Sequence, residues 1–355
     1  QESYRKILRY ILAKQRVSRK EICEELNLAW GTVSNNVNLM INEKIIQEEI
    51  PIINGVGRST CFLVPNDQAY AAIGVDINTI GISVSLVLLN GETKYFSTIP
   101  VKELKQKEII DDTFEVIDRT LAFNNAKYQI ISIGISCQGD IFSHTGMFYK
   151  MPFINDWEPI NLVEMIENKY GICTFQSHDM KCLLNDFKFR YPNNENIIVS
   201  RVVDGIGFGI IKEGVVINET ISLDYGHEIV ERNGLQCECG QKGCLEVYSS
   251  IRGITKRLNI TEDELYAHYE KYSNVLDDAI EKYAYSLVNI ASIFNINDIV
   301  VYGKLFAKIP SLFGKLEKKI DSIEKREGFN INLNYLSDLS ASFGVAFYSF
   351  EKLFE

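Results

Sequence analysis

The chain has 355 residues, of which 46% are hydrophobic and 24% charged, with 7 Pro and 23 Gly. This composition is typical of a globular protein long enough for two or three domains, and it excludes a disordered, fibrous or single small-domain protein. The net charge of −10, taken alone, argues against nucleic acid as a partner, because such affinity comes largely from neutralising phosphates. No stretch is apolar for long enough to form a membrane helix, and the start has no apolar signal core. We therefore expect a cytoplasmic protein with no membrane partner.

The charge is distributed unevenly along the chain. Residues 1–66 carry nine Lys and Arg against seven Asp and Glu, so the remainder carries 28 against 40. The head is therefore weakly basic and the body strongly acidic, and seven of the basic groups lie within the first 20 residues. This asymmetry leaves nucleic acid open as a partner of the head alone.

The head has the pattern of three helices and two strands. Apolar residues recur at helical spacing from Tyr4 to Leu12, and Ser18 followed by Glu21 has the spacing of a capping box at a second helix. After a break at 27–30, a third helix is expected over 32–46. The apolar side of this helix is expected to comprise Val33, Val37, Leu39, Met40 and Ile41. Two strands around a Gly-rich tip at 54–57 follow.

This order predicts a winged helix-turn-helix DNA-binding domain over residues 1–66. Asn and Ser side chains can both donate to and accept from base edges, and Arg can hold phosphates. The residues expected to contact DNA are Arg19, Thr32, Ser34, Asn35, Asn36 and, at the wing, Arg58. The alternative is a helical subdomain of another kind or a protein-docking module.

Three of the eight cysteines fall within eight residues, which is unlike a disulfide framework. His227, Cys237, Cys239 and Cys244 follow one another at spacings of ten, two and five residues in a loop punctuated by glycine. One imidazole and three thiols can complete a tetrahedral zinc site with no position left for water, so one structural zinc per chain is expected. The alternative is three buried free thiols and an unrelated histidine. The other five cysteines, Cys23, Cys61, Cys137, Cys173 and Cys182, are expected to be small core residues.

The body has the pattern of a duplicated α/β fold. Strand-like segments at 71–77, 81–89 and 93–101 precede an amphipathic helix at about 102–124 and a strand at 128–136. A similar order of strands begins again near Asn196, and helices and the strand at 297–303 follow the cysteine-rich loop. The sequence therefore predicts two related lobes.

Nearly the whole chain resembles the ROK family (repressor, open reading frame, kinase). The most specific match is DYGH at Asp224–His227 with CECGQKGCLE at Cys237–Glu246, the family's zinc and sugar signature. Supporting segments are IGVDINT at Ile73, GISCQGDI at Gly134, HDMKCLL at His178, VDGIGFGI at Val203 and SASFGVAFYSF at Ser340. The resemblance implies an actin-like ATPase (RNase H-like, duplicated) fold over 67–355. Its expected lobes are about 67–190 plus the C-terminal helix, and about 191–339.

The phosphate loops depart from the pattern of the family's kinases. These enzymes have two Gly and a Thr in the first loop, because bare backbone N–H groups and a hydroxyl must approach the ATP phosphates. Here Asn78 and Thr79 replace the glycines and Ile80 takes the hydroxyl position. In the second loop Asp204 stands where phosphate needs a donor, and like charges repel. We therefore expect that ATP binding and kinase activity are lost.

The sugar-binding positions are better preserved. By resemblance they are Gly139, Pro152, His178, Asp179, Asp224, His227 and Glu246. Asp179 takes the position of the kinases' general base, and without a phosphoryl donor it would only hold the sugar. His178 replaces the usual Asn and Asp224 the usual Glu, which points to an unusual sugar. Trp157 is expected either to line the sugar cleft or to lie in the core.

A winged head before a ROK body is the arrangement of the family's repressors. The resemblance therefore implies a sugar-responsive transcriptional regulator, and we expect it to be a repressor. It is expected to bind operator DNA as a homodimer or dimer of dimers. Two alternatives are a ROK sugar kinase with an added head, and a regulator that responds to a protein partner in place of a sugar.

Overall fold

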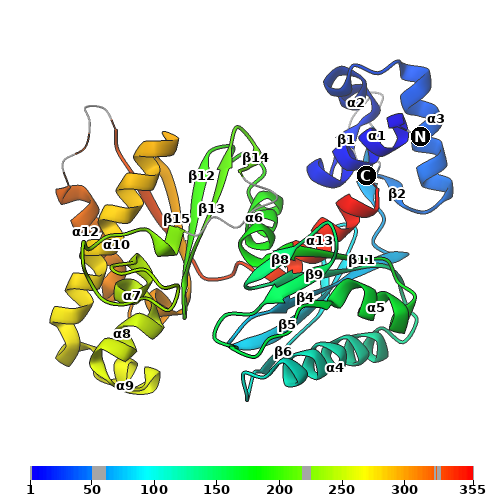
Figure 1. The fold of residues 1–355 in the computed structure, drawn as a ribbon. Coiled ribbons are helices and arrows are strands. Elements are labelled where there is room, and N and C mark those ends of the chain that lie inside the picture. The colour runs from blue at the N-terminus through cyan, green and yellow to red at the C-terminus, as the bar shows by residue number, and fades with distance from the viewer. Residues whose placement is uncertain (1, 50–60, 218–224, 324, 326–328, 355) are drawn as a thin grey trace. The chain divides into compact units, whose positions relative to one another are not determined.

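A computed structural model describes residues 2–49, 61–217, 225–323, 325 and 329–354. The chain separates into two compact units, one made of 1–192 with 340–355 and the other of 193–339. The first unit contains the head and one α/β lobe, and the second unit is the other lobe (Figure 1). Within the described ranges, no helix is long and apolar enough to cross a membrane.

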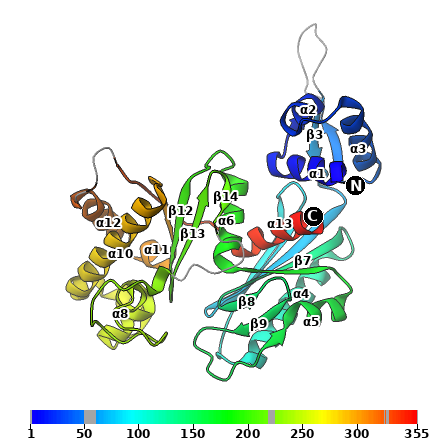
Figure 2. The same cartoon turned by 45° about the horizontal axis from the view of Figure 1, so that its top comes forward.

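The head is built of three helices and a small sheet (Figure 2). The helices are α1 (Glu2–Lys14), α2 (Arg19–Leu26) and α3 (Trp30–Asn42). The strands, in sheet order, are β1 (Val17–Ser18), β3 (Phe62–Pro65) and β2 (Ile46–Glu49), all antiparallel. This is the predicted winged helix-turn-helix arrangement, although the tip of the wing, with Arg58, lies outside the described residues.

The capping box predicted for the second helix is confirmed. Ser18 Oγ accepts a hydrogen bond from the Glu21 backbone N–H (3.2 Å), and the Glu21 carboxylate accepts one from the Ser18 N–H (2.6 Å). These two bonds satisfy orphan donors of the first turn and fix the start of α2 at Arg19.

The third helix differs from its predicted range. It begins at Trp30 and ends at Asn42, because Lys44 adopts a left-handed φ of 59° and turns the chain so that Ile45 and Ile46 enter the head's core. Its predicted apolar side is also wrong at Leu39, whose side chain is exposed. The apolar spacing continues past Asn42, so the prediction from spacing carried the helix through the turn that ends it.

The lobe of the first unit contains a five-stranded sheet of order β11-β7-β4-β5-β6. Its strands are β4 (Tyr70–Ile77), β5 (Gly81–Leu88), β6 (Thr93–Pro100), β7 (Gln129–Cys137) and β11 (Thr174–His178). β4, β7 and β11 are parallel, and β5 and β6 continue the sheet antiparallel. The helices are α4 (Gln106–Asn124), α5 (Leu162–Tyr170), α6 (Asp179–Arg190) and α13 (Ala341–Leu353). A small sheet of β8 (Asp140–Phe142), β9 (Met147–Lys150) and β10 (Ile160–Asn161) follows β7.

The C-terminal helix α13 packs unusually closely on this lobe (Figure 1). A Cβ added to Gly74 of β4 would lie 1.8 Å from the Ser342 carbonyl oxygen, and one on Gly344 would lie 1.8 Å from that of Cys182 in α6. Buried hydroxyl pairs also join the helix to the sheet, since Ser342 Oγ lies 2.7 Å from Ser85 Oγ. The lobe is therefore completed by a helix more than 140 residues further along the chain.

The second unit repeats this topology. Its sheet has the order β14-β13-β12-β15-β16, with β12, β15 and β16 parallel and β13 and β14 antiparallel. The strands are β12 (Ile197–Val202), β13 (Ile206–Lys212), β14 (Val215–Val216), β15 (Asp298–Tyr302) and β16 (Asn332–Leu336). Its helices are α7 (Leu245–Ser249), α8 (Ile251–Leu258), α9 (Glu262–Ala267), α10 (Ser273–Phe294), α11 (Lys304–Lys308) and α12 (Ser311–Ser322). The predicted duplication of the α/β fold is confirmed.

Two sequence expectations about single residues are decided by burial. Trp157 is 9% exposed, packs on Phe148 with ring centroids 4.5 Å apart and donates from Nε1 to the Phe148 carbonyl, so it belongs to the core. Cys137 and Cys182 are buried as expected, and burial raises the pKa of both thiols. Cys173 is exposed, contrary to the expectation of a core residue, because it lies in the irregular segment between α5 and β11.

Candidate functional site

Three parallel strands of the first unit end at the same level. Ile77 of β4 is paired with Cys137 of β7, which is paired in turn with His178 of β11. The segments that follow these strands therefore meet at one edge of the sheet. In open α/β sheets, the carboxyl ends of the strands are where ligands bind.

At this edge the first phosphate-loop segment is closed by its own side chains. The Asn78 side-chain oxygen accepts from the backbone N–H groups of Ile80 (3.0 Å) and Gly81 (3.1 Å). The Asn78 amide donates to the Asp76 carboxylate (2.9 Å), which also accepts from the Ser136 hydroxyl (2.6 Å). The turn is thus an Asx-type turn whose backbone donors already have partners.

Gln138 completes the closure from the neighbouring strand. Its side-chain oxygen accepts from the backbone N–H of Thr79 (3.1 Å) and from the Thr79 hydroxyl (3.3 Å). Backbone N–H groups that hold a phosphate must point into open space toward the ligand. Those of Thr79, Ile80 and Gly81 point to side-chain oxygens of this chain.

Gly139 and Pro152, two of the expected sugar-binding positions, lie beside each other. Gly139 has a left-handed φ of +120°, and a Cβ there would lie 2.9 Å from Pro152 Cδ and 2.2 Å from the Lys150 carbonyl oxygen. Only glycine fits such a position without moving the backbone.

His178 and Asp179, two further expected positions, form a pair at the start of α6. Asp179 is 1% exposed, and its Oδ1 lies 2.9 Å from His178 Nδ1 and accepts from the Met180 N–H (2.7 Å). A carboxylate in the first turn of a helix is stabilised by the helix dipole. The pair therefore presents a fixed carboxylate and an imidazole at the same edge as Gly139.

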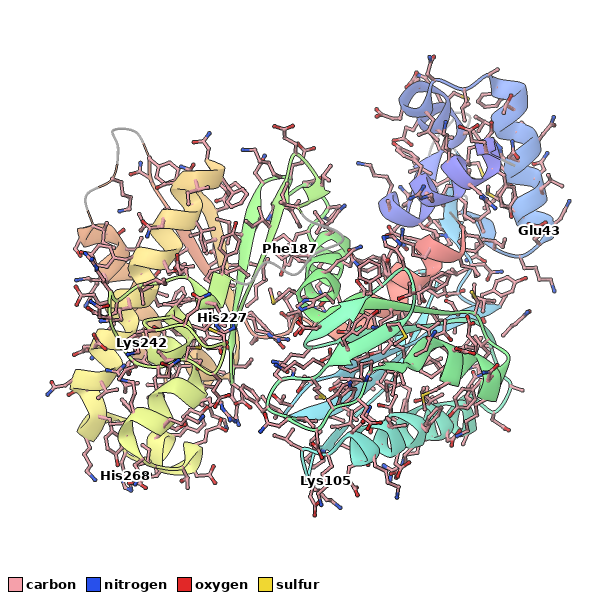
Figure 3. The ribbon with its side chains drawn as sticks, in the orientation of Figure 1. Glu43, Lys105, Phe187, His227, Lys242 and His268 are labelled. Atoms are coloured by element: carbon pink, nitrogen blue, oxygen red, sulfur yellow. The ribbon has the colours of Figure 1, made fainter. Side chains whose placement is uncertain are left out.

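In the second unit, the four predicted metal ligands come together. His227 Nδ1 lies 3.6 Å from Cys237 Sγ, Cys239 Sγ lies 3.6 Å from Cys244 Sγ, and all four ligand atoms lie within 4.8 Å of one another. Sulfurs bound tetrahedrally to zinc at about 2.3 Å are roughly 3.8 Å apart. The residues therefore fit a four-coordinate metal site, with Nδ1 as the histidine's ligand atom (His227 is labelled in Figure 3).

The backbone of this loop is shaped around the cluster. Gly243 has a φ of +81°, and a Cβ there would lie 1.8 Å from the Glu231 carbonyl oxygen. Its own carbonyl accepts from the N–H groups of Val230 (2.9 Å) and Glu231 (3.2 Å). Glu238, between two of the cysteines, forms ion pairs with Arg252 and Lys256 of α8. The loop is therefore held by α8 as well as by its own turns.

Glu246, another expected sugar-binding residue, lies in α7 directly after the metal loop. Its Oε2 accepts a hydrogen bond from the Ile206 N–H (3.2 Å). The same oxygen would lie 2.7 Å from a Cβ added to Gly205, so the carboxylate sits directly against this glycine. Burial raises the pKa of this carboxyl, and the nearby His227 opposes the shift. His227 and Glu246 are thus neighbours in the second unit, whereas Asp224 lies outside the described residues.

An acidic network lies near the second phosphate-loop segment. The Tyr266 hydroxyl donates to Glu262 Oε1 (2.5 Å), to which Lys304 Nζ is also paired (2.6 Å). Burial, the hydrogen bond to Glu262 and the charge of Asp204 together raise the pKa of Tyr266. Asp204, in the second phosphate-loop segment, is thus close enough to Tyr266 for its charge to act on the Tyr266 hydroxyl.

The side chains expected to contact DNA differ in availability. Asn35 is exposed, and Thr32 and Ser34 are half-buried. Asn36 donates to the Thr32 carbonyl of its own helix (2.7 Å), so its amide is turned back onto α3. Arg19 is paired with Glu48 of β2 (2.7 Å) and donates to Asn38 (3.3 Å).

Sequence reasoning missed the exposed Trp30, the Asx turn that Asn78 forms, and the contact of Gln138 with Thr79. Trp30 was assigned to the break before the third helix, but it begins α3 and is exposed. The Asn at the end of a strand was a usable signal for an Asx turn. Gln138 had no local signal, because its partner Thr79 is 59 residues away.

Two family models match this chain. Residues 72–345 match the model of the ROK family, and residues 3–47 match that of winged helix-turn-helix DNA-binding domains. Since the first match covers well over half of the chain, the protein belongs to the ROK family, as the resemblance implied.

The relatives include named repressors. The xylose repressor of Bacillus spizizenii is 25% identical over 338 residues, covering 89% of this chain and 85% of that protein. The regulator NagC of Escherichia coli is 26% identical over 250 residues, covering 68% of this chain and 61% of its own length.

Solved structures share the fold. A ROK family transcriptional regulator, homologous to Escherichia coli Mlc, superposes with a TM-score of 0.76 at 18% identity over 95% of this chain and 92% of its own. A ROK glucokinase from Streptomyces griseus superposes with a TM-score of 0.64, also at 18% identity, over 79% and 98%. Nearly all of the glucokinase is therefore matched by about four fifths of this chain.

Proposed function

We propose that the protein is a sugar-responsive transcriptional repressor that binds operator DNA through its winged head. The observation that carries this proposal is the closed first phosphate-loop segment in a chain that also carries a DNA-binding head. In that segment, Asn78 and Gln138 occupy the donors of Thr79, Ile80 and Gly81. The named repressors among the relatives support the same function.

The effector is a carbohydrate bound by residues of the ROK body. Buried carboxylates accept hydrogen bonds from adjacent hydroxyl groups, which is the chemistry that polyol recognition requires. The residues proposed to bind it are Gly139, Pro152, His178 and Asp179 of the first unit, with Asp224, His227 and Glu246 of the second. With His227 Nδ1 directed to the cysteines, Nε2 is the nitrogen left for the sugar.

The metal is zinc, one ion per chain, held by His227, Cys237, Cys239 and Cys244. Three thiolates and one imidazole suit a closed tetrahedral site. The ion then has a structural role: it fixes the loop that precedes Glu246 and orients the His227 ring.

The second candidate is a ROK sugar kinase with an added head, since kinases share the fold. Against it stand the occupied backbone donors of the first segment and the acidic Asp204 near the second. We therefore propose that the protein does not transfer phosphate from ATP. The DNA-bound form is a homodimer or dimer of dimers, because two-fold symmetry matches palindromic half-sites.

The function is tested by DNA and sugar binding to the full chain. Duplexes are selected from a random pool, and a panel of monosaccharides and amino sugars is screened for shifts in melting temperature. Any sugar found is then titrated into the protein–DNA complex. Binding of a selected duplex, with an affinity that the sugar changes by about tenfold or more, supports the proposal.

Asp179→Asn provides the matched variant. It keeps the size of the side chain but removes the charge, so sugar binding and the sugar's effect on DNA are expected to be lost while DNA affinity is unchanged. If no duplex is selected, or if Asp179→Asn responds to the sugar as the parent does, the proposal is wrong.

A further inference from the structure

Trp30, the first residue of α3, is 58% exposed. Among the described residues it makes no hydrogen bond, ring contact or cation–π contact that would account for its orientation. The other tryptophan of the chain, Trp157, is only 9% exposed. Isolated exposed apolar residues are common, so the exposure matters only because of where it occurs.

The residues around Trp30 are open to the solvent on the same helix. Nothing lies within 4 Å of a Cβ added to Gly31, and Asn35 one turn further is exposed. α3 contains no charged residue, so it presents no carboxylate to repel a phosphate backbone. The start of α3 thus presents the Trp30 ring, the unobstructed backbone of Gly31 and the Asn35 amide together. These groups are suited to contact base edges in the major groove of DNA.

The start of α3 is also not built for stability. Ala29 occupies the N-cap position and provides no side-chain hydrogen bond, whereas α2 is capped by Ser18 and Glu21. An Ala at the N-cap leaves the first backbone N–H groups of the helix without the side-chain acceptor that Ser, Thr, Asp or Asn would provide. A small N-cap residue followed by Trp and Gly leaves room for a partner to approach this end closely.

We propose that Trp30 is a specificity-determining residue that packs against thymine 5-methyl groups in the major groove. The N-terminal residues of a recognition helix are the ones that contact base edges, and the thymine methyl is the apolar group that the major groove displays. Trp30 thereby selects thymine at the step facing the start of α3, and Asn35 reads a neighbouring base edge. This inference rests on the proposed function, because it requires that the head binds DNA.

The test is a double-mutant cycle on the full chain and a duplex selected from a random pool. Each thymine in the duplex is replaced in turn by uracil, which removes only the methyl group. At one or two positions, the parent is expected to lose affinity about fourfold, since a buried methyl-sized group contributes about 0.8 kcal/mol. Trp30→Ala is expected to bind about tenfold more weakly and to be insensitive to uracil at those positions. Trp30→Phe is expected to recover part of both effects.

Phe96→Ala is the matched control, because Phe96 is an equally exposed aromatic residue (60%) on β6 of the lobe. It is expected to bind DNA like the parent and to keep the sensitivity to uracil. Acrylamide quenching of the parent gives a second measurement: the exposed Trp30 is quenched in free protein and protected in the complex, whereas the buried Trp157 changes little.

The outcomes separate this inference from the proposed function. If the parent selects no duplex, the proposed function fails and the inference with it. If the parent binds a duplex but Trp30→Ala binds equally well, or loses affinity and retains the same uracil sensitivity, only the inference is overturned. Equal binding would mean that Trp30 contributes nothing to DNA affinity, and lost affinity with unchanged uracil sensitivity would mean that it contacts a phosphate or a sugar.

Discussion

The side-chain oxygen of Gln138 accepts two hydrogen bonds from Thr79, one from its backbone N–H at 3.1 Å and one from its hydroxyl at 3.3 Å. A phosphate at this place would have to displace Gln138 from both donors, and Asn78 from two more. Each such exchange removes an existing hydrogen bond worth about 1 kcal/mol net. The first phosphate-loop segment is therefore closed to phosphate as long as these hydrogen bonds are in place.

The first prediction is that the protein shows no ATP-dependent sugar phosphorylation and no saturable shift in melting temperature with ATP and Mg²⁺. The Asn78→Gly variant removes one of the two side chains that occupy the donors, and Gln138 still holds Thr79, so no activity is expected to appear. A coupled assay is the measurement. Turnover by the parent in the usual enzyme range of about 1 to 1000 per second would contradict the prediction.

The second prediction concerns metal content. Purified protein is expected to contain about one zinc ion per chain, and Cys244→Ala about none, because three remaining ligands hold the ion much less tightly. The melting temperature of the variant is expected to fall. Cys173→Ser is the control, since Cys173 is an exposed thiol outside the cluster and its loss should leave the metal in place. Metal analysis of folded parent protein without zinc would refute the assignment.

The third prediction follows from the pairing of Arg19 with Glu48. The Arg19 side chain is largely buried and lies 2.7 Å from the Glu48 carboxylate, so Glu48 competes with DNA for its charge. Glu48→Gln is expected to raise DNA affinity about two- to fivefold and to steepen its dependence on salt by about one phosphate contact.

Glu24→Gln is the matched control for Glu48→Gln. It adds the same charge to the head, but Glu24 pairs with the exposed Lys20 of its own helix, at 3.6 Å. It is expected to change affinity much less. Equal gains from the two variants would mean that net charge, and not the release of Arg19, is responsible.

The fourth prediction tests the close packing of α13. Gly344→Ala places a methyl group within 1.8 Å of the Cys182 carbonyl oxygen, so it is expected to lower the free energy of unfolding by about 1–3 kcal/mol or more. Gly314→Ala in α12 is the opposite case, because nothing lies within 4 Å of its Cβ. It is expected to stabilise by roughly 0.5–1 kcal/mol through helix propensity. Chemical denaturation measures both, and a Gly344→Ala protein as stable as the parent would show that α6 and α13 readily move apart.

Features encoded over short stretches of chain were predictable from the sequence. The capping box of Ser18 and Glu21 depends on two residues three positions apart, and the strand and helix order of both lobes depends on local periodicity. The metal cluster was also predictable, since its ligands lie within eighteen positions and their chemistry restricts them to one geometry.

Only the tertiary structure decided the features that depend on distant partners. The end of α3 depends on the burial of Ile45 and Ile46, and the core position of Trp157 on its contact with Phe148. The closure of the phosphate-loop segment requires Gln138 to meet Thr79 from another strand. Spacing along the chain specifies which donors and acceptors a segment offers, but their partners are chosen by the register of the sheet, because hydrogen bonds and burial depend on distance in space.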